Sequence, residues 1–164
     1  MTFRVLSRRA ALALAVAALV PAVAGAQGPA RFRGVQVDVG PLRASVGDPT
    51  AAWVAEALPG QLAQALGPHL APGDRSGATL VARVDSIYLG PSSGGTGPLG
   101  SSQDTIAGEL LIHGRRGSEA IPLRAISSYF PSPVDQPLAA RAYHDRVFNL
   151  AQAFAYWVPR QLGL

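Results

Sequence analysis

The chain has 164 residues, of which 48% are hydrophobic and 15% charged, and it contains no cysteine. Without cysteine, disulfides, thiol chemistry and a lipid-modified N-terminal cysteine are all excluded. The formal net charge of +4 comes from fourteen basic residues, all arginine, against ten acidic ones.

The first 27 residues read as a secretory signal peptide. Three arginines precede an apolar run over residues 10–20, and Ala24-Gly25-Ala26 supplies a small-residue cleavage pattern. The run is too short to cross a bilayer, which needs about 20 residues. Cleavage near Ala26 predicts a mature chain of residues 27–164, a single soluble domain in the periplasm or secreted. That part keeps eleven arginines and all ten acidic residues, so its charge of +1 gives no support for a nucleic-acid partner or a stable membrane anchor.

The mature chain begins with a predicted strand followed by a helix. From Phe32 the apolar residues alternate through Val39, which is the period of a half-buried strand. A loop is expected from Gly40 to Asp48, where Asp48 is placed to cap a helix and Pro49 to begin it. The helix carries an apolar residue every four positions up to Leu66, and Pro59 is expected to kink or divide it.

Three further strands are predicted at residues 78–89, 105–113 and 120–130. The last two are joined by a tight hairpin at residues 114–117. Pro122 indicates either that its strand lies at a sheet edge or that the strand begins at this residue, because proline has no N–H group to donate to the neighbouring strand. A final helix is expected from residue 135 to Pro159. Its seam of large side chains is interpreted as core: Tyr143, Val147, Leu150, Phe154 and Trp157.

The order strand, helix, three strands, helix predicts an α+β fold. The economical arrangement is a two-layer sandwich, with two helices on one face of a four-stranded mixed sheet.

No catalytic, cofactor or metal constellation is indicated. Residues 95–100 match the pattern G-x-G-x-x-G, but a strand follows where nucleotide binding needs a helix, so no cofactor is expected. The three histidines lack metal-ligand spacing. Asp38 and Asp85 are interpreted as solvated charges on an outward sheet face. The arginines at 83, 115, 116 and 124 read as scattered surface charges, with a gathered basic patch as the alternative.

The stretch from Val35 to Leu66 resembles a bacterial envelope module. It runs VQVDVGPL, then GDP, then WVAEAL and LAQAL, and the strand at 78–89 extends it. It is similar to the N-terminal domain of TolB and to curli-assembly and penicillin-binding-protein-activator lipoproteins. Unlike those lipoproteins, the chain has no lipobox cysteine, and unlike TolB it has no propeller. The resemblance implies a non-enzymatic envelope role.

We therefore expect an exported, non-enzymatic accessory protein that binds another envelope component. The alternative is a periplasmic carrier of a small ligand, and an enzyme ranks third. The long connection over residues 90–103, an edge strand and an aromatic beside the helix stripe are the expected contact sites. The candidate partner-binding residues are Trp53, Ser93, Gly95, Leu99 and Pro122.

Overall fold

The computed structural model describes residues 31–91, 102–114, 117–129 and 139–164. Within them the chain forms four strands, three α-helices and a single turn of 3-10 helix. The predicted leader lies outside the described residues. The elements in chain order are β1 (Phe32–Asp38), α1 (Gly40–Val46), α2 (Thr50–Ala65), the 3-10 turn (Gly67–His69), β2 (Ala78–Tyr88), β3 (Ser102–Gly114), β4 (Gly117–Tyr129) and α3 (Ala139–Gln161).

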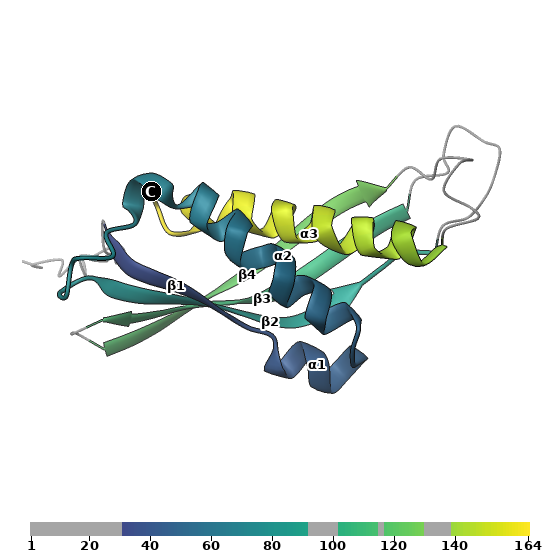
Figure 1. Cartoon of the computed structure of the whole chain (residues 1–164), viewed down its shortest axis with the longest axis horizontal. Helices are drawn as coiled ribbons and strands as arrows, with labels where there is room; N and C mark the ends of the chain where they lie inside the picture. The colour runs from purple at the N-terminus through teal and green to yellow at the C-terminus, as the bar shows by residue number, and fades with distance from the viewer. Residues whose placement is uncertain (1–30, 92–101, 115–116, 130–138) are drawn as a thin grey trace, which may run out of the picture.

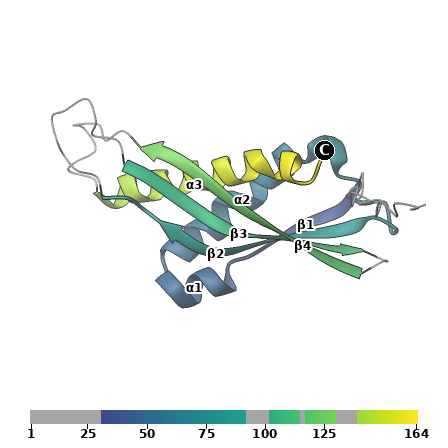
Figure 2. The ribbon, with the colours of Figure 1, turned by 180° about the vertical axis from the view of Figure 1, so that it is seen from behind.

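The strands form one mixed sheet in the order β1-β2-β3-β4. β1 is parallel to β2, as expected for strands joined by a helical crossover, and the two later pairs are antiparallel. Helices α2 and α3 pack side by side along one side of the twisted sheet (Figure 1). Seen from behind, the strands lie in front of both helices (Figure 2). The α+β two-layer prediction is therefore confirmed.

The core lies between this helix pair and the sheet. The predicted stripe of α2 is fully buried, because its four-residue period keeps one face toward the strands. Every second side chain of β2 and β3 points from the sheet toward this stripe. The central buried side chains are Val54, Leu58, Leu62, Leu66, Leu80, Val84, Ile106, Leu110, Leu150 and Phe154.

The segment after β1 departs from the prediction. Residues 40–46 form helix α1 in place of the expected loop, with proline in its first turn, where a missing N–H costs nothing. Asp38 Oδ1 accepts a hydrogen bond from the Gly40 amide at 2.9 Å, and Leu42 is buried. The capping role expected of Asp48 is wrong: Pro49 occupies the N-cap, and the Asp48 carboxylate pairs with Arg43 at 3.3 Å.

Pro59, which was expected to kink or divide its helix, does not divide it, and Pro159, which was expected to end the last helix, lies inside it. Helix α2 continues past Pro59 to Ala65, and α3 continues past Pro159 to Gln161. The apolar stripe of each helix spans its proline, and burial of that stripe outweighs one lost backbone hydrogen bond. The predicted seam of α3 is buried only in its middle, because Tyr143 is 50% and Trp157 39% exposed.

Candidate partner-binding surfaces

Strand β4 is a sheet edge, which is the first of the two alternatives that Pro122 indicated. The second is wrong, because the strand begins at Gly117. Its inner side pairs with β3 over its whole length, and no strand in the described part of the chain pairs with its outer side. Thirteen residues is long for an unprotected edge, since unpaired amides and carbonyls invite pairing with another strand.

The register shows which backbone groups point outward. Gly114 pairs with Gly117 across the hairpin, so the odd-numbered residues of β4 exchange hydrogen bonds with β3. The even-numbered residues then turn their N–H and C=O groups away from the sheet. Pro122 fits this alternation because its carbonyl accepts a hydrogen bond at 3.2 Å from Gln161 Nε2, at the end of α3.

The two halves of this outer side differ. In the half that ends at Pro122, the outward N–H of Pro122 is missing because proline has none, and its carbonyl already accepts the hydrogen bond from Gln161. From Leu123 to Ser128, no strand in the part of the chain that the structure describes lies beside the outward N–H and C=O groups of Arg124, Ile126 and Ser128. We call this stretch, Leu123–Ser128, the distal β4 edge.

Exposed side chains flank the distal β4 edge on both faces of the sheet. Ile126 is 49% exposed on the face away from the helices. On the helix side, Trp157 lies one turn before Gln161 on the same face of α3, which turns it toward β4. The Arg160 guanidinium carbon lies 5.3 Å from the centroid of the Trp157 ring, a cation–π contact.

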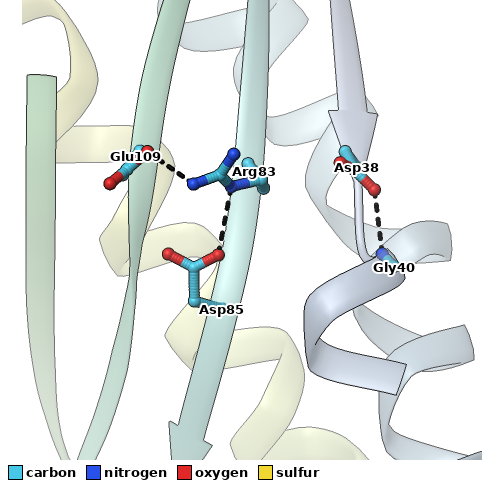
Figure 3. Close-up of polar contacts among 5 residues, drawn as sticks. All are labelled: Asp38, Gly40, Arg83, Asp85 and Glu109. Atoms are coloured by element: carbon cyan, nitrogen blue, oxygen red, sulfur yellow. Dashed lines mark hydrogen bonds and ion pairs between the residues drawn. The ribbon is translucent and has the colours of Figure 1, made fainter. Parts of the chain in front are cut away.

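The face without helices carries an ionic cluster in its centre. Arg83 donates to Glu109 Oε2 at 2.7 Å and to Asp85 Oδ1 at 3.2 Å (Figure 3). Asp38 is opposite Arg83 in the register, but its carboxylate binds the Gly40 amide. The alternative of a basic patch is not supported at Arg83, because two carboxylates compensate its charge. The predicted residues Arg115 and Arg116 lie outside the described residues.

A buried ion pair fastens α3 to the sheet. Arg146 Nε donates to Asp104 Oδ2 at 2.8 Å, and its Nη2 donates to Asp104 Oδ1 and to the Gly90 carbonyl, the latter at 2.6 Å. The Gly90 amide donates back to Asp104 Oδ1 at 3.0 Å. The side chains of Arg146 and Asp104 are only 4% and 1% exposed. This cluster joins the end of β2, the start of β3 and α3, and the sequence analysis missed it.

Side chains with catalytic potential are dispersed. His113 Nδ1 lies 2.8 Å from Ser118 Oγ across the β3–β4 hairpin, but both residues are exposed, and no ion pair in the described part of the chain involves His113. Within the described residues, no group of three His, Asp or Glu side chains is placed to hold a metal ion. None of the described helices combines the length and apolar character needed to cross a membrane.

The other predicted contact residues have different outcomes. Trp53 is partly buried, packs against the core and meets the His144 ring edge-on, with centroids 5.6 Å apart. Ser93, Gly95 and Leu99, together with the G-x-G-x-x-G match, lie outside the described residues. Of the five candidates, Pro122 is therefore the one that the structure places at an unpaired backbone edge.

Comparison with known proteins gives structural neighbours only. The chain is similar to the minor lipoprotein of Acinetobacter baumannii, with 16% identity over 79% of this chain and 94% of the other and a TM-score of 0.38. It is also similar to rare lipoprotein B of Shewanella oneidensis, with 10% identity over 79% and 93% and a TM-score of 0.42. No family model and no curated protein matches the sequence. At these identities and TM-scores the neighbours assign neither a family nor a function, and the resemblance to TolB, curli-assembly and activator lipoproteins stays a prediction.

Proposed function

We propose that this protein is an exported, non-enzymatic accessory protein of the cell envelope, and that it binds another envelope component by adding one of the partner's strands to its own sheet. The observation that carries the proposal is the distal β4 edge. An edge of this kind supplies main-chain hydrogen bonds to an extended segment, while pockets and flanking side chains select which segment binds.

The location rests on the sequence. An arginine-led apolar leader ending in Ala-Gly-Ala is typical of export. The mature part carries a charge near zero and no cysteine, which suits a periplasmic domain that is held together by packing alone.

The absence of a catalytic role is part of the same proposal. The carboxylates on the face without helices are already engaged: Asp85 and Glu109 with Arg83, and Asp38 with a backbone amide. Asp104, the most buried carboxylate described, is bound by Arg146 and the Gly90 amide. A general acid or base needs a proton-transfer partner within hydrogen-bond reach in an accessible site, and these groups are committed to structural contacts.

Photo-crosslinking in intact cells tests the proposal. A benzophenone side chain placed at Ile126, which is 49% exposed on β4, is compared with one at Val46, which is 43% exposed on α1. We expect Ile126 to crosslink to one envelope protein, through residues that mass spectrometry locates in an extended segment. Equal crosslinking from both positions, or none from Ile126, contradicts the proposal.

A further inference from the structure

Among the described residues, the charges beside the distal β4 edge that lack an ion-pair partner have one sign. Between residues 120 and 129 the only charged residue is Arg124, and between residues 147 and 161 of α3 the only one is Arg160. Both side chains are exposed, and neither takes part in an ion pair within the described part of the chain. The acidic residue nearest in the register, Glu109, is bound to Arg83.

These two arginines approach the edge from opposite faces. α3 runs antiparallel to β4 (Figure 1), and Gln161 fixes their alignment at Pro122. One helical turn of about 5.4 Å back from Gln161 corresponds to about two strand residues at roughly 3.3 Å each. Trp157 and the stacked Arg160 therefore lie beside Arg124, with Arg160 on the helix side and Arg124 on the open face.

An added strand would present its side chains alternately to these two environments. On the open face it meets Arg124 and Ile126, and on the helix face it meets Trp157 and Arg160. Acidic side chains at either face gain an arginine partner, whereas basic ones meet uncompensated positive charge. Apolar side chains between them would cover Ile126 and Trp157.

Building on the proposed function, we infer that the distal β4 edge receives an acidic, extended segment of a partner protein, and that this segment ends at Pro122. Beyond that point the missing amide and the occupied carbonyl offer no continuation of the ladder. Because neighbouring side chains of a strand point to opposite faces, the partner segment carries two adjacent carboxylates, one for each arginine, and then two adjacent β-branched residues that cover Ile126 and Trp157.

Fluorescence anisotropy with synthetic peptides tests the charge requirement. The probe is a fluorescein-labelled peptide of repeated Glu-Glu-Val-Val, which places both glutamate and valine on each face of the added strand. Its counterpart carries lysine in place of glutamate. Wild-type protein should bind the glutamate peptide and not the lysine peptide. Arg124→Glu should weaken the glutamate peptide about tenfold, equivalent to roughly 1.4 kcal/mol, and strengthen the lysine peptide.

Two proline variants test where the segment ends. Ile126→Pro removes an outward amide of the distal β4 edge and should weaken the glutamate peptide about fivefold or more, since one net hydrogen bond contributes roughly 1 kcal/mol. Ala120→Pro removes an equivalent outward amide on the other side of Pro122 and should leave binding unchanged. Melting temperatures of both variants close to that of the wild type establish that neither change unfolds the sheet.

Several results would overturn the inference. They are equal binding of both peptides, no effect of Arg124→Glu, or equal losses from the two proline variants. Binding to phosphatidylglycerol vesicles in place of the peptide, or a dimer that Ile126→Pro dissolves, overturns it as well. If Ile126 still crosslinks to one envelope protein but the protein binds both peptides equally, the proposed function is supported and only the inference of an acidic partner segment is contradicted.

Discussion

The buried pair between Arg146 and Asp104 yields the sharpest prediction on stability. Arg146→Met leaves a carboxylate that is 1% exposed with the Gly90 amide as its remaining donor among the contacts described above. Removing one partner of a buried pair costs about 3–5 kcal/mol, because the other charge stays desolvated and uncompensated. With a urea m-value of about 2 kcal/mol per M, the unfolding midpoint should fall by roughly 2 M.

A double-mutant cycle separates the pair from its surroundings. In Asp104→Asn with Arg146→Met no buried charge remains, and the asparagine carbonyl still accepts from the Gly90 amide. We therefore expect the double variant to be no less stable than the worse single variant, with a coupling energy of about 2 kcal/mol or more. Urea unfolding followed by tryptophan fluorescence and circular dichroism measures all four proteins.

The half-exposed pair between Arg43 and Asp48 is the matched control. Its side chains are 52% and 58% exposed, and such surface pairs contribute roughly 0–1 kcal/mol. Asp48→Asn should therefore change the free energy of unfolding by about 0.5 kcal/mol or less. Single Arg146 or Asp104 variants that lose no more than this control, or a strictly additive double variant, would refute the reasoning.

Three further predictions concern glycines and one carboxyl group. A Cβ at Gly108 would overlap the backbone carbonyl of Arg83, so Gly108→Ala should lower stability by about 3 kcal/mol or more in a urea titration. Gly60 has open space around it in helix α2, and Gly60→Ala should raise the melting temperature, since alanine favours a helix by about 1 kcal/mol. Hydrogen bonds from the hydroxyl and amide of Ser76 lower the pKa of Asp74 below 3.8. The stabilisation from this depressed pKa is present above pH 3.8 and is lost as the pH falls through the lower, folded value. Ser76→Ala should move the pKa of Asp74 up toward 3.8 in an NMR titration, and an unchanged pKa contradicts the assignment.

The strands could be predicted because apolar and polar residues alternate along them in the sequence with a period of two. Burial of Leu80, Ala82 and Val84 follows directly from the pleat. Helix α1 was missed because Gly40-Pro41 reads equally as a strand terminator and as a helix start. Only the buried position of Leu42 and the bond from Gly40 to Asp38 decide between them, and both depend on the tertiary structure.

The buried ion pair left a signal that the sequence analysis did not use. Asp104 has the same parity as Ile106 and Leu110, so a carboxylate falls on the buried face of β3. Arg146 lies four residues before Leu150 in the seam of α3. A charge in an apolar stripe requires a partner, but 42 residues separate these two. The distal β4 edge, by contrast, follows from Pro122 once the strand order is known.

Amide hydrogen exchange on β4 tests the central claim most directly. In the free protein the outward amides of Arg124, Ile126 and Ser128 should exchange fast, while the alternate amides bonded to β3 are protected. Saturation with the valine–glutamate peptide should slow these three amides and leave their neighbours unchanged. Uniform protection along β4, or protection confined to the surface of α3, would contradict strand addition at this edge.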